Sequence, residues 1–247
     1  MKTINMLAVA CTVVAATVAP HSTAAANTEP VIALGLLGSY NELEFKGQSN
    51  DIERMPEGGL FLNYGNKLTG HAGLVFHAEI SGQYSEKQGQ RVKDLQADLD
   101  LGWRLALDAN NFLDLLVGAG YKWNSFDPGY NKYDIELTNR TPFAKVAIGY
   151  NHQFDNSVLR LEAGARRSLE GDAQLEIQGV SNQTLDLQSS TDPYVELSVL
   201  FNQHGSLPII ASLYYNHFNY EPEGQFDFTQ YDKQTRHEYG AKLGIVF

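Results

Sequence analysis

Few of the side chains that commonly carry out catalysis occur in an arrangement that would support it. The only cysteine, Cys11, lies in a segment that we expect to be removed, which excludes thiol catalysis, thiolate metal sites and disulfides from the mature chain. The sequence contains no HExxH zinc motif, no calcium-binding loop and no glycine-rich phosphate loop. We therefore expect no metal site and no cofactor.

One arrangement of histidine and carboxylate residues could support hydrolysis at the rim of a sheet. It combines His217 or His237 with Asp227 or Asp232, as an acid–histidine pair would require. A serine nucleophile is disfavoured because the segments beside His217 offer no serine at its level. A rim hydrolase is a minor alternative, since a histidine near acidic loops is more often an interface residue.

A larger set of charged residues occurs at every second position of segments whose other positions are apolar. These side chains would therefore share one face of a sheet. Inside a narrow closed sheet they would pair with one another across the interior, and the alternative is a narrow, cation-preferring channel. The set is Glu79, Asp94, Asp98, Asp100, Arg104, Asp114, Lys122, Lys145, Arg160, Glu162, Arg166, Glu196, Glu238 and Lys242.

The positioning elements are strands, because the alternation has a period of two rather than a helical period. The clearest segment runs from 91 to 107, with apolar side chains from Leu95 to Leu107 on one face. Ten segments are expected, which permits closure into an antiparallel barrel; eight is the alternative if the first hairpin or the region near 172–188 is misread. The expected strands are 30–46, 57–66, 71–85, 91–107, 112–126, 139–154, 157–171, 190–203, 207–220 and 235–247.

The connections between these segments alternate in length. They are short near 66–71, 108–111, 155–157 and 202–207, and longer near 46–57, 125–139, 171–190 and 221–234, with 86–91 as a short exception. Short turns at one end and longer loops at the other are typical of transmembrane barrels. Apolar residues on both sides of Gly179 indicate that the 171–190 connection continues as a hairpin.

The first 26 residues have the pattern of a secretory signal peptide. Lys2 precedes an apolar stretch from Ile4 to Val18, and small residues end at Ala26. The stretch is shorter than the roughly 20 residues that a membrane helix needs. We expect residues 1–26 to be cleaved and residues 27–247 to form a single barrel domain.

The alternating pattern resembles the small bacterial outer-membrane β-barrels, a group that includes the OmpA membrane domain, OmpX, OmpW and the opacity proteins. Its most specific part is the carboxyl end, where the resemblance implies a signal for the barrel assembly machinery. That signal is Tyr239, Ala241, Leu243, Ile245 and Phe247. The resemblance covers the whole mature chain but selects no subfamily. Ten strands would be similar to omptin proteases and the OpcA adhesin, yet omptin's catalytic signatures do not match specific positions here.

This resemblance implies a place in the outer membrane, in contact with lipid and lipopolysaccharide, with both termini in the periplasm. Two belts of aromatic residues fit this orientation, since such rings prefer membrane interfaces. The expected outer belt is Tyr84, Tyr121, Trp123, Tyr215 and Tyr239, and the inner belt is Tyr150, Phe154, Phe201 and Phe247.

The charge balance limits the partners of the protein. With 18 Lys and Arg against 29 Asp and Glu, the net charge is −11, which disfavours nucleic acid. No Lys or Arg occurs between Arg167 and Lys233, so the last two long loops are acidic. We expect a non-enzymatic surface barrel that acts in envelope integrity or adhesion, through an extracellular ligand at these loops. The alternatives are the narrow channel and the rim hydrolase.

Overall fold

The structure is a computed structural model that describes residues 29–47, 51–129, 135–224, 226 and 231–247. The signal peptide expected at 1–26 lies outside the described residues. Within those residues, no helix has the length and hydrophobicity needed to cross a membrane.

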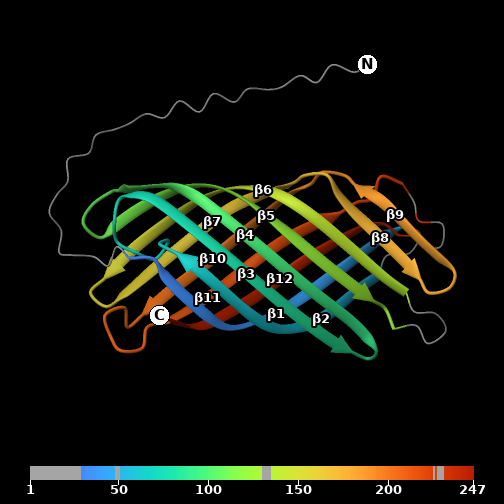
Figure 1. The fold of residues 1–247 in the computed structure, drawn as a ribbon, viewed down its shortest axis with the longest axis horizontal. Coiled ribbons are helices and arrows are strands. Elements are labelled where there is room, and N and C mark those ends of the chain that lie inside the picture. Colours follow the sequence, from blue (N-terminus) through green and yellow to red (C-terminus); the bar gives the residue numbers. More distant parts are fainter. Residues whose placement is uncertain (1–28, 48–50, 130–134, 225, 227–230) are drawn as a thin grey trace, which may run out of the picture.

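Ten antiparallel strands close into a barrel, seen from the side in Figure 1. The strands follow one another around the barrel in chain order, apart from the step from β7 to β10, and β12 pairs with β1 to close the ring. The prediction of ten strands is confirmed, and the alternative of eight is wrong. The barrel strands are β1 (Val31–Gly47), β2 (Asp51–Gly65), β3 (Gly73–Lys87), β4 (Gln90–Ala106), β5 (Asn111–Asp127), β6 (Ile135–Phe154), β7 (Ser157–Ser168), β10 (Thr191–Phe201), β11 (Ile209–Tyr220) and β12 (Tyr231–Val246).

A separate hairpin extends the wall of the barrel, as the sequence predicted. It consists of β8 (Gly171–Ile177) and β9 (Ser181–Leu187), and β8 pairs with the first residues of β6, from Ile135 to Arg140. The hairpin lies at the end of the barrel opposite the carboxyl terminus (Figure 1). We call the end with the hairpin the loop end, and the end with both described termini the turn end.

Three strands begin four or more residues earlier than the sequence predicts. β2 begins at Asp51 instead of 57, β6 at Ile135 instead of 139, and β12 at Tyr231 instead of 235. The expected long connection near 46–57 is therefore wrong, because β1 and β2 remain paired as far as Phe45 and Asp51.

The physical reason is that the alternation of polarity reverses at the loop end. Leu43 and Met55 point inward and are buried, whereas Glu42 and Arg54 point outward and form an ion pair of 2.9 Å. Outward apolar residues therefore do not mark these parts of the strands, although the alternation of inward and outward side chains is unbroken there.

The short connection near 86–91 is a two-residue hairpin turn. Gln88 and Gly89 both have positive φ angles, of 54° and 86°. This is the backbone of a type I′ turn, which suits the right-handed twist of paired strands and favours glycine. β3 and β4 therefore remain paired up to Lys87 and Gln90.

The outer wall of the barrel carries a continuous band of exposed apolar side chains between two levels of aromatic residues. On β4, for example, Leu95, Leu99 and Trp103 are each more than 40% exposed. The residues expected for the outer belt lie toward the loop end, and those expected for the inner belt lie toward the turn end. Within the outer belt, the rings of Tyr215 and Tyr239 are 5.1 Å apart.

We predict that the barrel does not depend on its hairpin. Replacing residues 171–187 with a short turn removes pairing from the first residues of β6 and from Pro222 and Glu223, but from no other part of the ring, so the barrel should still close. The variant should retain the heat-dependent gel shift of a closed barrel and lose only a few degrees of thermal stability, because apolar residues beneath the hairpin become exposed. Loss of the gel shift would show that the hairpin is part of the folding unit.

Candidate functional site

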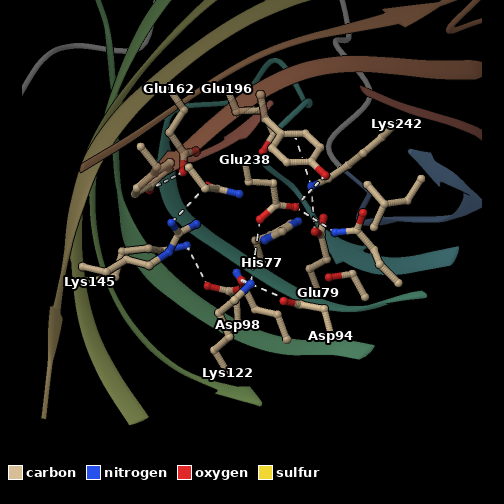
Figure 2. Close-up of a pocket in the computed structure, with 18 of the residues that line it drawn as sticks. His77, Glu79, Asp94, Asp98, Lys122, Lys145, Glu162, Glu196, Glu238 and Lys242 are labelled. Atoms are coloured by element: carbon tan, nitrogen blue, oxygen red, sulfur yellow. Dashed lines mark hydrogen bonds and ion pairs between the residues drawn. The ribbon is translucent and has the colours of Figure 1, made fainter. Parts of the chain in front are cut away.

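The inward-facing side chains form a dense network of ion pairs, part of which is shown in Figure 2. Near the turn end, Arg104 lies 2.6 Å from a carboxylate oxygen of Asp114, and neither side chain is exposed. Arg160 contacts the same carboxylate and lies 2.7 Å from Glu162. Gly149 leaves room for the Arg160 guanidinium, since a Cβ added at this position would collide with its Nη2 atom.

The connection between β2 and β3 folds back into the barrel at the turn end. Lys67 and Thr69 are buried there, and the Nζ atom of Lys67 lies 2.7 Å from Asp100 and 2.9 Å from Glu162. Arg104 donates hydrogen bonds to the backbone carbonyls of Lys67 and Thr69, which hold the turn inside. We call residues 66–70 the inner turn.

Two lysines each contact two carboxylates in the middle of the barrel. Figure 2 shows both side chains extended toward the axis from opposite sides of the wall. The contacts are those of Lys145 with Asp98 (3.4 Å) and Asp100 (2.7 Å), and those of Lys242 with Glu79 (2.6 Å) and Glu196 (3.5 Å).

A third group of charges lies closer to the loop end. The fully buried guanidinium of Arg236 lies 2.6 Å from Asp94, 3.1 Å from Glu57 and 3.7 Å from Glu238. Lys122 lies 3.0 Å from Asp94 and 3.8 Å from Glu238. Two positive charges are thus shared among three carboxylates.

Arg166 is held differently from the other lumen cations. Among the described residues, no carboxylate oxygen lies within 4.0 Å of its guanidinium. The guanidinium lies 4.2 Å from the ring centre of Tyr194 and donates a hydrogen bond to Asn216 at 3.0 Å. Stacking on an aromatic face stabilises a cation that is removed from water. Tyr194 in turn donates a hydrogen bond of 2.8 Å to Glu162, which connects Arg166 to the network.

Apolar clusters close the barrel on both sides of the charged network. At the loop end, the inward side chains are Leu43, Phe45, Met55, Val92 and Phe126. A cluster at the turn end contains Ala33, Leu37, Phe61, Leu68, Val158, Leu200, Ile210, Tyr214 and Val246. Such clusters exclude water and hydrated ions from a narrow passage.

Between the described lumen side chains lie two small cavities, each with a volume of about 50 Å³. Each cavity can hold about three to five water molecules, at about 10–15 Å³ for each water by the same measure. The two cavities share the side chains of Lys67, His77, Glu79, Glu162 and Glu196. The two cavities therefore adjoin each other at this layer of charged groups.

All fourteen residues that the sequence assigned to the lumen face the inside of the barrel, and thirteen of them take part in ion pairs. The exception is Arg166. Several further members of the network were missed: Glu57, Lys67, His77 and Arg236. Arg236 lies two positions before Glu238, so the period of two places both side chains on the same face and could have identified Arg236. Lys67 lies in an expected turn, where no alternation indicates the direction of a side chain.

The histidines considered for a rim hydrolase point away from the lumen. His217 and His237 lie side by side on the outer wall, on β11 and β12, with their rings 4.8 Å apart. Asp227 and the side chain of Asp232 lie outside the described residues. The described residues therefore do not assemble the proposed acid–histidine pair.

The hairpin has one apolar and one polar face. Its inner face, with Ala173, Leu175, Ile177 and Leu187, packs against Phe218 and other apolar residues over the mouth of the barrel. Its outer face exposes Glu176 and Asp186, and neither forms an ion pair with a described residue. Asp192, counted with the acidic loops, is instead buried and accepts hydrogen bonds from Ser190 and Asn219.

No protein-family model and no curated protein matches this chain. The fold is similar to that of the outer membrane protease OmpT from Escherichia coli, with a TM-score of 0.58 at 9% identity, covering 91% of this chain and 98% of OmpT. The translocator domain of the autotransporter NalP from Neisseria meningitidis gives a TM-score of 0.40 at 11% identity, with 87% and 88% of the two chains covered. A major outer membrane protein from Thermus thermophilus gives 0.38 at 10% identity, with 86% and 99% covered.

At these identities the similarity concerns the fold and not the chemistry. The chain has the fold of the bacterial outer-membrane β-barrels, in its ten-stranded form.

Proposed function

We propose that the protein is a closed, non-enzymatic barrel of the bacterial outer membrane that interacts with basic partners through its acidic hairpin. The apolar band supports the location. From Leu95 to Leu105 on β4 every second side chain faces outward, and at about 3.4 Å per residue and a tilt of about 40° this run spans about 25 Å. That is the height of the lipid-facing band of such barrels, and a patch of this size in water would cause aggregation.

The proposed orientation places the turn end in the periplasm and the hairpin outside the cell. Both described termini lie at the turn end, and the long connections lie at the other, as in bacterial barrels of this class. Phe247, 75% exposed, ends the outward row Tyr239, Ala241, Leu243 and Ile245. We propose this row as the signal for the assembly machinery and the wall around it as the surface that meets lipid and lipopolysaccharide.

The observation that carries the closed state is the filling of the lumen. Ion pairs span its middle, apolar side chains fill both ends, and the inner turn occupies the turn end. The remaining space is about 50 Å³ in each of two cavities. Such filling supports an interior without a continuous path for a hydrated cation.

The second candidate is a narrow channel, and one observation favours it. The two cavities meet at a shared charged layer that contains Glu79 and Glu196, so movement of the inner turn would join them to the turn end. Planar-bilayer recording separates the two functions. We expect no reproducible openings from the purified protein, and none from a D98N/D100N variant. Cation-biased openings that the double substitution alters would make the protein a channel.

We predict that Arg236 is needed for the stability of the closed lumen. Arg236→Met should lower the free energy of unfolding by about 3–5 kcal/mol, because it leaves Glu57 without an ion-pair partner among the described residues and leaves Asp94 and Glu238 with Lys122 alone. The matched control is Arg54→Met, which removes an exposed pair with Glu42 and should cost less than about 1 kcal/mol. Urea-induced unfolding followed by tryptophan fluorescence gives both values, and equal losses would contradict a structural role for the lumen network.

We predict that the hairpin binds positively charged surfaces. The double variant E176Q/D186N should reduce binding of a lysine-rich peptide at low salt by about fivefold or more, and added salt should reduce the difference. The control D108N/D155N removes two charges near the turn end. Equal binding by both variants would mean that the acidic face is only a solvated rim.

A further inference from the structure

The outer wall of the barrel carries a pair of histidines whose position the proposed function does not use. His217 on β11 and His237 on β12 are directly opposite residues of two neighbouring strands. Their side chains point outward. They form the next outward-facing pair after Tyr215 and Tyr239 toward the loop end. We propose that this histidine pair is a binding site for a divalent transition-metal ion of the zinc type.

The distance between the two nitrogen atoms is the first argument. The Nδ1 atoms of His217 and His237 face each other at 3.4 Å. Two Zn–N bonds of about 2.0–2.1 Å at the tetrahedral angle place the nitrogens about 3.3–3.4 Å apart. The square-planar geometry of Cu²⁺ would need a shorter separation, of about 2.8–3.0 Å. The pair therefore already has the spacing of a tetrahedral site.

The surroundings supply further groups that suit a cation. The phenol oxygen of Tyr215 lies 2.9 Å from the Nδ1 atom of His237 and is a third potential ligand atom beside the pair. Glu42 on β1 is directly opposite His237, and Glu44 is the next outward-facing residue of β1 toward the loop end. Both carboxylates already have cationic partners, Arg54 at 2.9 Å from Glu42 and Lys46 at 3.6 Å from Glu44, so the site rests on the histidine and phenol atoms. Ca²⁺ and Mg²⁺ are not favoured, because they prefer sets of oxygen ligands.

Asn219 would position one of the two rings. Its amide lies 2.9 Å from the Nε2 atom of His217 and also contacts Thr235 and Asp192. When Nδ1 binds a metal, the neutral ring carries its proton on Nε2. Asn219 would then turn its oxygen toward this N–H and give up the hydrogen bond that its Nδ2 atom donates to Asp192. Such outer partners orient metal-bound histidines.

The described residues contain no group of three or more His, Cys, Asp or Glu side chains arranged for a metal ion. The protein would therefore supply two nitrogen ligands, and water would fill the remaining positions. Both histidines are only partly buried, so the site is open to solvent. Sequence analysis did not indicate it, because the two residues are far apart in the chain and form no short motif.

The test is titration of the full barrel, purified without a polyhistidine tag, with Zn²⁺ in a calorimeter. We expect one strong site per barrel, lost or weakened at least about tenfold in both His217→Ala and His237→Ala. The matched control His204→Ala removes a histidine of the turn between β10 and β11 and should bind as the unmodified protein does. The gel shift confirms that each variant is folded.

Spectroscopy separates a coordinated ion from a merely structural histidine pair. Co²⁺ bound at the site should give the intense visible absorption of a tetrahedral complex, and added Zn²⁺ should remove it. Tyr215→Phe should change this spectrum if the phenol is a ligand. Unchanged Zn²⁺ affinity in both histidine variants, or an octahedral Co²⁺ spectrum, would overturn the proposal.

Discussion

Closure of the backbone hydrogen-bond ladder is the constraint on which the rest of this structure depends. A band of apolar side chains around the wall is compatible with stable strands only if no edge is left open, because an unpaired backbone group in lipid costs several kcal/mol. The β1–β12 and β5–β6 pairings complete the ring. Ten strands enclose a narrow interior, so the charged side chains that alternate with the apolar ones are brought into contact with one another instead of with water.

The charged interior follows from this geometry. A single charge deprived of water would be strongly destabilising. Most lumen cations lie close to two or more carboxylates, as Arg236 does with Glu57 and Asp94. Arg166, which stacks on Tyr194, shows that an aromatic face can take the place of a carboxylate. The lumen is therefore a polar core of fixed geometry, and this core limits what can pass through the barrel.

The sequence predicted the barrel well because the period of two is a local property of each strand. It predicted the lumen residues for the same reason, since a residue such as Asp98 is placed by its immediate neighbours. The limits of β2, β6 and β12 were wrong where the polarity reverses and Leu43 and Met55 turn inward. Lys67 could not be predicted, because the folding of a short turn into the barrel is decided by Asp100 and Glu162, which are distant in sequence.

The reversal of polarity also shows where the membrane ends and where function is to be sought. In the lipid-facing part, apolar side chains are outside and charges inside; beyond the tyrosines at 215 and 239, the outside carries Glu42, Arg54 and the histidine pair, while apolar clusters fill the inside. The loop end is thus built like a small water-soluble barrel standing on a membrane barrel. In the proposed closed state, the groups available to other molecules lie on the outer wall and on the acidic face of the hairpin.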